Sequence, residues 1–304
     1  MKTKILFAAA LLSLASFCLA DNLDGQLDSI ITNSGISQTK TVYVRNAQGN
    51  VVEETLLTGS TDGWKQSRKR EYEYNEEGKP TSLIDYTWNS ETNVWTYERK
   101  SIYTYNDSEN QEVRITYNWD NGSSTWKKYV EYKLQYTYDV DGKMMNYVQS
   151  VKSATDTWVN LLKYDYTYNS SGQLVLKRNY AWDADNSMWN VGGKCEYTYD
   201  SKGNNILEIV YDWDKASESW KPNTKYEMTY SQHGKLHTEI VSLLSNVNSW
   251  IEISKSTYYY HGEQTAIFNV DVPADLQTTK LLRNGQLFIQ RGDKTYTVTG
   301  LEVK

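Results

Sequence analysis

Tryptophans at a regular spacing are the residues of this chain whose type and position could do chemistry. One tryptophan recurs about every 31 residues, and in four repeats another precedes it by seven positions. Aromatic faces stack on sugar rings, so a row of them at fixed spacing suits a glycan chain. The ligand-binding candidates are the tryptophans next to the expected loops: Trp88, Trp95, Trp119, Trp126, Trp182, Trp189, Trp213 and Trp220.

A packing role competes with this interpretation. Leu, Ile and Phe are scarce in the same alternating positions, so Trp and Tyr have to supply the core of a thin sheet. Burying each large side chain contributes on the order of 1.5–3 kcal/mol. We therefore expect most of the aromatic residues to be core, and only those near the loops to meet a ligand.

Metal binding and catalysis find less support in the sequence. Asp183-Ala-Asp185 and Asp212-Trp-Asp214 offer carboxylates, but no loop has the spacing of a calcium loop, and a turn-starting aspartate is the simpler account. His233 and His237 have a zinc-like spacing without the helix and glutamate of a metalloprotease. We expect no catalytic residue, metal or cofactor. The alternative is an enzyme acting on polysaccharide, which requires two carboxylates from different repeats in one cleft.

The elements that position the tryptophans are strands. Between Gly203 and Tyr230, Leu207, Ile209, Tyr211 and Trp213 alternate with their neighbours, and the run after the next loop alternates likewise. A period of two over such runs indicates β-strands, here with one aromatic face and one polar face.

Turn chemistry joins these strands. An Asn, Asp or Ser is followed three positions later by glycine at 75–78, 139–142, 169–172, 200–203 and 231–234. Such turns place glycine at a positive φ, and Asn110 takes its place in a sixth copy. Each repeat is then an antiparallel hairpin.

The hairpins predict an all-β fold: an antiparallel meander of about 14 strands in an elongated, twisted or coiled sheet, open or closed. Placing Trp88 opposite Trp95 sets Tyr86 opposite Tyr97 and Ile84 opposite Arg99. The first and last repeats each lack one tryptophan, as expected of capping units.

A membrane barrel is the alternative to this soluble sheet. A lipid-facing band has to be uncharged at mid-height, whereas the aromatic face as predicted carries five polar or charged residues: Arg99, Lys128, Asn160, Arg178 and Glu252. We expect a chain that does not span a membrane.

The N-terminus indicates export. Lys2 and Lys4, the apolar run from Ile5 to Leu14 and Cys18-Leu-Ala20 are typical of a cleaved secretory signal. The net charge is −6 and becomes more negative on cleavage, so nucleic acid is a poor partner. Cleavage leaves Cys195 alone, on a predicted apolar strand face, where it is expected to be a small buried side chain.

The segment Tyr197-Thr-Tyr-Asp-Ser-Lys-Gly-Asn204 resembles the Tyr-Asp repeats of Rhs-type proteins. The resemblance covers residues 41–262 and implies spiralling β-hairpin sheets; the tryptophan pair is not part of that pattern. The chain also looks like uncharacterised exported repeat proteins of Gram-negative bacteria.

The C-terminal tail has a different composition, without tryptophan, and predicts three short strands parted by glycine turns. It carries Asn284-Gly285-Gln-Leu287 and, near its end, Gly300. It resembles the C-terminal sorting domain of type IX secretion cargo. That resemblance implies export by the type IX machinery through residues 279–304, then release or attachment at the surface. A terminal β-cap is the alternative.

The predicted organisation is a signal peptide (1–20), a linker (21–40), seven hairpin repeats (41–262) and a sorting-like β domain (263–304). The predicted function is that of an exported scaffold for binding or adhesion at the cell exterior, secreted or on the surface. The expected partner is a glycan first and a surface protein second. A purely structural matrix protein is the further alternative.

Overall fold

The chain divides into two units, Met1–His261 and Gly262–Lys304, in a computed structural model. The structure describes residues 26–35, 37–60, 63–260, 278–283, 286–291, 294–297 and 302–303. The expected signal peptide at residues 1–20 lies outside the described residues.

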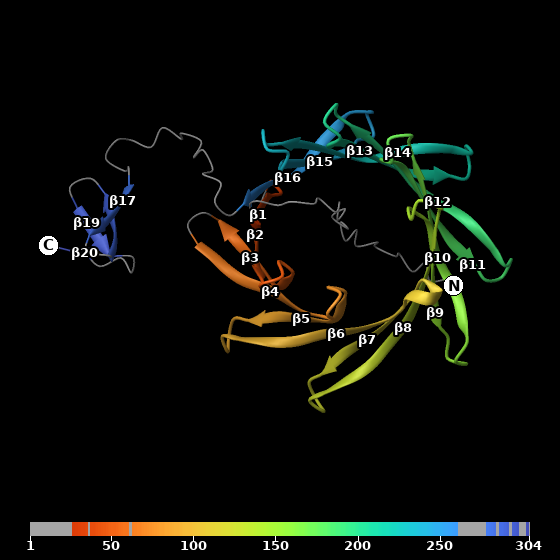
Figure 1. Ribbon diagram of the computed structural model, residues 1–304, viewed down its shortest axis with the longest axis horizontal. Coiled ribbons are helices and arrows are strands. Elements are labelled where there is room, and N and C mark those ends of the chain that lie inside the picture. The colour runs from red at the N-terminus through yellow and green to blue at the C-terminus, as the bar shows by residue number, and fades with distance from the viewer. Residues whose placement is uncertain are drawn as a thin grey trace. The chain divides into compact units, whose positions relative to one another are not determined.

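Sixteen antiparallel strands form a closed barrel in the first unit (Figure 1). A short 3-10 turn, η1 (Asp107–Glu109), interrupts one connection. The strands are β1 (Leu27–Asn33), β2 (Gln38–Arg45), β3 (Val51–Ser60), β4 (Gly63–Tyr74), β5 (Pro80–Asn89), β6 (Val94–Asn106), β7 (Gln111–Asp120), β8 (Thr125–Tyr138), β9 (Met144–Lys152), β10 (Trp158–Tyr168), β11 (Leu174–Asp183), β12 (Met188–Tyr199), β13 (Asn205–Asp214), β14 (Ser219–Tyr230), β15 (Leu236–Leu244) and β16 (Trp250–Tyr260).

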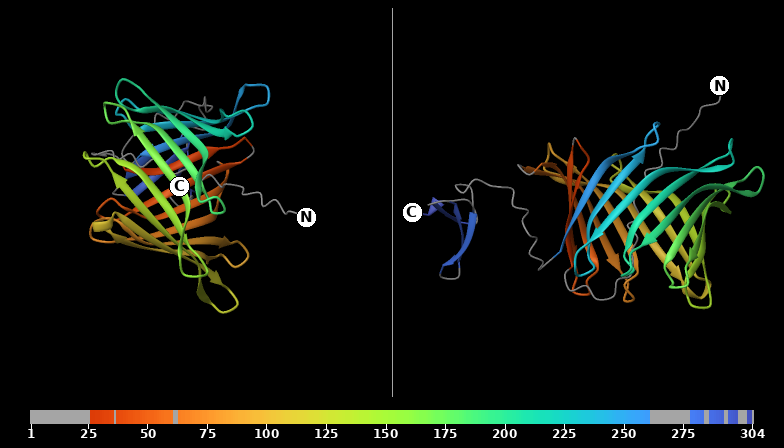
Figure 2. Two further views of the ribbon diagram at one scale, coloured as in Figure 1. Left: turned by 90° about the vertical axis from the view of Figure 1, so that its right-hand side faces the viewer. Right: turned by 90° about the horizontal axis from the view of Figure 1, so that it is seen from above.

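The predicted antiparallel meander is confirmed, and its sheet closes. β1 pairs with β2 on one side and with β16 on the other, where Thr32 lies opposite Ser256 and their hydroxyl oxygens are 2.8 Å apart. Figure 2 shows the continuous wall. Closure leaves this sheet without an edge, so the expected edge protection by atypical end repeats is replaced by strand pairing.

The range predicted as a linker, 21–40, needs correction. β1 and the first residues of β2 occupy residues 27–33 and 38–40 of it. These strands also bring the barrel to sixteen strands instead of about fourteen. β1 reads Leu-Asp-Ser-Ile-Ile-Thr-Asn, which has no strict alternation of apolar and polar residues, and its partner β16 lies at the far end of the repeat array.

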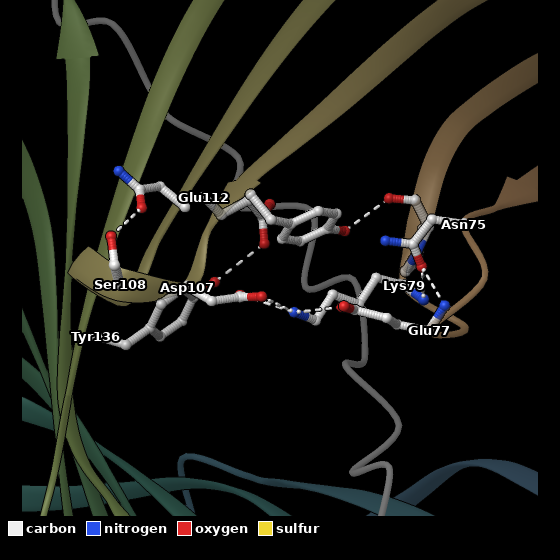
Figure 3. A network of polar contacts seen from close by, with 10 residues as sticks. Asn75, Glu77, Lys79, Asp107, Ser108, Glu112 and Tyr136 are labelled. Carbon is white, nitrogen blue, oxygen red and sulfur yellow. Dashed lines mark hydrogen bonds and ion pairs between the residues drawn. The ribbon is translucent and has the colours of Figure 1, made fainter.

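The predicted turns are confirmed. In the hairpin after β4, the amide of Gly78 donates to the carbonyl of Asn75, and the Asn75 side chain accepts from the amides of Glu77 and Lys79. Gly78 has a φ of 77°, and Asn110 replaces glycine at a φ of 50°. Lys79 of this turn reaches Asp107 of the next one at 2.7 Å (Figure 3).

A β-bulge in every repeat changes the predicted arrangement of the two sheet faces. It inserts one unpaired residue three positions after each recurring tryptophan. The inserted residues are Ser67, Glu98, Tyr129, Leu161, Gly192, Asn223 and Ile253. Because side chains alternate with a period of two, the extra residue moves everything after it to the opposite face.

The bulge therefore separates tryptophan from the Tyr-x-Tyr pairs. All eleven tryptophans share one face, here called the Trp face, and the Tyr-x-Tyr pairs share the other, the Tyr face. The prediction of a single aromatic face is wrong for this reason. Tyr86 does lie opposite Tyr97, but Ile84 lies opposite Lys100, and Arg99 falls on the Tyr face opposite Asp85.

The Tyr face lines the inside of the barrel. Inward side chains converge and lose solvent, whereas outward ones diverge. Burial raises the pKa of Glu112, Glu208 and Glu239 on this face. Burial also raises the pKa of Tyr258 on β16. Glu239 on β15, Tyr43 on β2 and Tyr230 on β14 raise it further, so side chains of several strands approach Tyr258 on this face. On the Trp face, burial pushes the pKa of Glu71 upward, but hydrogen bonds from Lys69 and Tyr86 leave it lowered.

The expected aromatic core is absent from the described part of the chain. No large side chain there is fully buried, and the buried apolar residues are Cys195 and Met228. Cys195 is thus buried as predicted, on the Tyr face. Each tryptophan is half-buried because it packs on its cross-strand neighbour while the wall is a single sheet.

The second unit is a separate antiparallel sheet of four strands in the order β17-β18-β19-β20. They are β17 (Thr278–Arg283), β18 (Gln286–Arg291), β19 (Lys294–Thr297) and β20 (Glu302–Val303). Three strands were expected here. Its sorting role stays a prediction.

Candidate functional site

The eight candidate tryptophans form four cross-strand pairs on the Trp face, next to four hairpin loops. Each pair is edge-to-face, with ring centroids 4.9–5.0 Å apart and interplanar angles of 64–67°. The pairs are Trp88–Trp95, Trp119–Trp126, Trp182–Trp189 and Trp213–Trp220. Their edge-to-face geometry is the one that aromatic quadrupoles favour.

Tyr97 joins two of these pairs into one surface. Its ring lies 4.9 Å from Trp119 and 5.3 Å from Trp126, across the boundary between two repeats. It also lies 5.1 Å from Tyr86 on its own hairpin. We call the resulting cluster over β5–β8 the aromatic platform: Tyr86, Trp88, Trp95, Tyr97, Trp119 and Trp126.

The platform presents accessible aromatic surface. Tyr97 is 43% exposed, and all four of its tryptophans are half-buried. Four neighbouring strands at about 4.8 Å spacing give it a width on the order of 14 Å. One isolated tryptophan pair spans only two neighbouring strands, so the platform is wider than any single pair.

An ion pair borders the platform on the β4 side. Lys69 lies 4.5 Å above the Tyr86 ring and 5.7 Å from Trp95, and contacts Glu71 at 2.5 Å. The Tyr86 hydroxyl donates to Glu71 at 2.5 Å. The Tyr86 ring therefore contacts both members of the ion pair and the Tyr97 ring.

The other two tryptophan pairs are not brought into such a cluster. Beside Trp213–Trp220, Lys194 covers Tyr211 at 4.4 Å and Trp220 at 5.2 Å, but Pro222 stands where Tyr97 stands in its repeat. Trp182–Trp189 has Val191 at that position. The tryptophan candidates therefore separate into a joined set and two isolated pairs.

Sequence reasoning missed Tyr86, Tyr97 and Lys69 as parts of the site. The signal in the sequence that could have identified Tyr97 is the type of residue two positions after each recurring tryptophan. It is tyrosine once and otherwise Gln66, Lys128, Asn160, Val191, Pro222 and Glu252. An exposed aromatic ring at one copy of a repeated position indicates a local role.

A shallow depression of about 400 Å³ lies at the β5–β6 hairpin. Trp88 is one of its lining residues; the others are Thr87, Asn89, Ser90, Glu91 and Thr96. Its lining combines Thr87 and Thr96, which are paired on the Tyr face, with Trp88 of the Trp face, so the depression lies at the tip of the hairpin.

The acidic loops form turns, as the simpler account predicted. The Asp183 side chain accepts from the amides of Asp185 and Asn186, both at 3.1 Å. Hydrogen bonds from the side chain and amide of Asn186 lower the pKa of Asp183. Within the described ranges, no three His, Cys, Asp or Glu residues gather where they would hold a metal ion.

The remaining reactive residues are Cys195 and the histidines. Burial and the neighbouring Glu208 raise the pKa of the Cys195 thiol to about 12, which disfavours a nucleophilic thiolate. His233 lies in a turn beside Gln232, and His261 lies outside the described residues.

Comparison with known proteins gives a family match for part of the chain. Residues 151–230 match a family of unknown function, DUF3836. No curated protein matches.

Three solved structures illustrate the range of similar folds. A DUF3836 family protein from Bacteroides vulgatus is 22% identical, with a TM-score of 0.27, and the alignment covers 34% of this chain and 92% of that one. A porin-like protein from Bacteroides uniformis is 11% identical, with a TM-score of 0.44, covering 77% and 96%. A Tc holotoxin from Photorhabdus luminescens is 12% identical, with a TM-score of 0.29, covering 88% and 14%. These scores carry no argument about function.

Among the described residues, no helical stretch has the length and apolarity that crossing a bilayer requires.

Proposed function

We propose that this protein is an exported, non-enzymatic scaffold that binds a glycan on the aromatic platform at the cell exterior. The observation that carries the proposal is the contact of Tyr97 with both Trp119 and Trp126. It joins two tryptophan pairs into one exposed aromatic surface spanning two repeats. A flat, rigid aromatic surface of this kind stacks on several sugar rings at small entropic cost.

A glycan fits this surface better than a lipid does. Lys69, Glu71, Lys100 and Arg178 occupy the Trp face along the strands. Charges at mid-height of a lipid-facing band are destabilising, so the proposal places water outside this barrel.

Binding of neutral soluble polysaccharides to the purified full-length chain tests the proposal. Tyr97→Ala and Trp119→Ala are expected to weaken binding about 3- to 10-fold each, since an aromatic contact contributes ~0.5–1.5 kcal/mol. Trp182→Ala is the matched control, because its pair lies outside the platform. Equal losses for Trp182→Ala and Trp119→Ala would contradict the platform as the site.

Two alternatives are outcomes of the same experiment. If none of the polysaccharides binds, the alternative of a purely structural matrix protein gains support. If bound oligosaccharide is cleaved, the protein is an enzyme and the proposal is wrong.

Export is the second part of the proposal, and its support is the N-terminal signal pattern and the tail's resemblance to a sorting domain. Deleting residues 279–304 is expected to hold the protein in the periplasm of its host. Arrival of the truncated protein at the cell exterior would refute the sorting role.

A further inference from the structure

The Tyr face contains one position per repeat where the repeats differ in chemistry. It lies directly opposite a residue that begins a Tyr-x-Tyr pair in five of the seven copies below and is Tyr43 or Met228 in the other two. From β3 to β15 this position holds Glu54, Leu83, Arg114, Tyr147, Lys177, Glu208 and Glu239, opposite Tyr43, Tyr72, Tyr103, Tyr136, Tyr166, Tyr197 and Met228. A variable residue on a repeated framework is where a repeat protein differentiates its surface.

Three consecutive copies form a distinct group. Arg114 on β7, Tyr147 on β9 and Lys177 on β11 place two cations on either side of an aromatic ring on the inner wall. On one side of the group the position is Leu83, and on the other it is Glu208. The equivalent position therefore carries no cation in the repeats on either side of the group.

A tyrosine ladder fills the wall between the two cations. Tyr147 stacks on Tyr164 with ring centroids 4.9 Å apart, and lies 5.8 Å from Tyr136 and 6.4 Å from Tyr166. The Tyr136 hydroxyl donates to Glu112 at 3.1 Å (Figure 3). All four tyrosines are half-buried, so part of each side chain is accessible to solvent.

Neither cation has a carboxylate ion pair within the described ranges. Arg114 lies 5.0 Å from the Tyr132 ring, and its Nε is buried without a hydrogen-bond partner there. Lys177 lies 4.8 Å above the Tyr164 ring. Arg70, on the same face, shows the contrast: it contacts Asp85 at 2.9 Å and Glu54 at 3.8 Å.

Two carboxyl groups accompany the cations, Glu112 beside Arg114 and Glu208 beside Lys177, and both are shifted toward their neutral form. Burial raises the pKa of Glu112, against the effects of Tyr136 and Arg114. Burial likewise raises the pKa of Glu208, against Asn205, Lys177 and Cys195. Burial lowers the pKa of Lys177, which an anion bound beside it would raise again.

We propose that Arg114, Lys177 and the tyrosine ladder form an inner-wall site for an anionic oligosaccharide, a glycan segment with carboxylated or sulfated units. Tyrosine rings stack on the sugars, while the guanidinium on β7 and the amine on β11, four strands or roughly 19 Å apart across the wall, bind acidic groups of different sugar units. This site lies on the opposite face from the aromatic platform, and it stands independently of the proposed function.

Calorimetry on the full-length protein, with oligogalacturonate and a heparin-derived oligosaccharide as probes, tests the proposal. Arg114→Gln and Lys177→Gln are expected to weaken binding at least about 10-fold, and Tyr147→Leu about 5-fold. Arg178→Gln is the matched control, since it removes a charge from the next residue along β11 on the outer face. Binding of oligogalacturonate shows that carboxylates suffice, whereas binding of the heparin-derived oligosaccharide alone shows that sulfate is needed, since heparin carries both groups.

A measurement on the unmodified protein guards against variants that fail to fold. Bound probe is expected to protect Lys177, but not Lys100 on the outer face, from a lysine-acetylating reagent, as read by mass spectrometry. Loss of binding in Arg178→Gln equal to that in Lys177→Gln, no protection of Lys177, or no binding of either probe would overturn the inner-wall site.

Discussion

The rings of Tyr97 and Trp119 lie 4.9 Å apart although they belong to different hairpins. Tyr97 lies two residues after Trp95, the second tryptophan of one pair, and Trp119 is the first tryptophan of the next pair. The contact exists because β6 and β7 are neighbours in the barrel wall and both side chains point outward. It makes two repeats into one continuous surface.

Coupling between these two residues is the first prediction. In a double-mutant cycle, Tyr97→Ala and Trp119→Ala are expected to show an interaction energy of ~0.5–1.5 kcal/mol in the free energy of unfolding, measured by denaturant titration. A cycle between Tyr97 and Trp213, on a distant hairpin, is expected to be additive. Additivity in the first cycle would mean that the platform is not a connected unit.

Barrel closure predicts a cross-link. Thr32 on β1 and Ser256 on β16 lie directly opposite each other, with hydroxyl oxygens 2.8 Å apart. The double variant Thr32→Cys/Ser256→Cys is expected to form a disulfide in the monomer under oxidation and to gain roughly 2–4 kcal/mol of stability.

The cross-link has a matched control. Ser242 lies on β15, one strand beyond β16, so Thr32→Cys/Ser242→Cys is expected to remain reduced. Non-reducing electrophoresis distinguishes the two outcomes, and an uncross-linked first pair would indicate an open sheet.

Glycine at the hairpin turns predicts a conformational cost. Gly142 has a φ of 79°, and a Cβ there would meet nothing within 4 Å. Gly142→Ala is therefore expected to cost ~1–2 kcal/mol through backbone strain alone. Gly63 is equally uncrowded but lacks the positive φ, so Gly63→Ala is expected to be neutral or slightly stabilising in thermal unfolding.

The second tyrosine of most Tyr-x-Tyr pairs donates a hydrogen bond to a backbone carbonyl, which predicts a repeated contribution to stability. The Tyr105 hydroxyl donates to the Pro80 carbonyl at 2.7 Å, and Tyr74 donates in the same way to Val51. Tyr105→Phe is expected to cost ~0.5–1.5 kcal/mol in unfolding free energy. Tyr129, which is 66% exposed, provides the control, and Tyr129→Phe is expected to change little.

Carboxyl groups on the two faces predict opposite pH dependences. Burial raises the folded-state pKa of Glu208, so the folded chain binds the proton more tightly than the unfolded chain, and this group's contribution to stability falls as pH rises above about 4.5. Glu208→Gln is expected to remove that fall and to stabilise the protein at neutral pH.

Glu71 behaves in the reverse sense. Its folded-state pKa is lowered, because hydrogen bonds from Lys69 and Tyr86 outweigh burial, so its contribution is present at neutral pH and is lost as pH falls through about 4.5. Glu71→Gln is expected to destabilise at neutral pH. Unfolding curves between acidic and neutral pH measure both variants, and the same sign for the two would contradict the assignment of inner and outer faces.

Local chemistry in the sequence determined the strands, their turns and part of their register. The period-two alternation, the glycines at positive φ and Asn110 in the glycine position are all properties of a few adjacent residues. The opposition of Trp88 with Trp95 and of Tyr86 with Tyr97 follows from the hairpin loop alone.

Only the tertiary structure decided which face each aromatic residue occupies. The bulge inserts residues as different as Ser67, Glu98 and Gly192, so no composition marks it, yet it moves Tyr-x-Tyr to the inside and leaves tryptophan outside. Closure likewise depends on hydrogen bonds between β1 and β16, whose sequences are unrelated and far apart. The contact of Tyr97 with Trp119 and the grouping of Arg114, Tyr147 and Lys177 both depend on the bulges and on barrel closure. The physical reason is that strand register and sheet face determine which side chains are neighbours across a sheet. Both are properties of the backbone of the whole barrel.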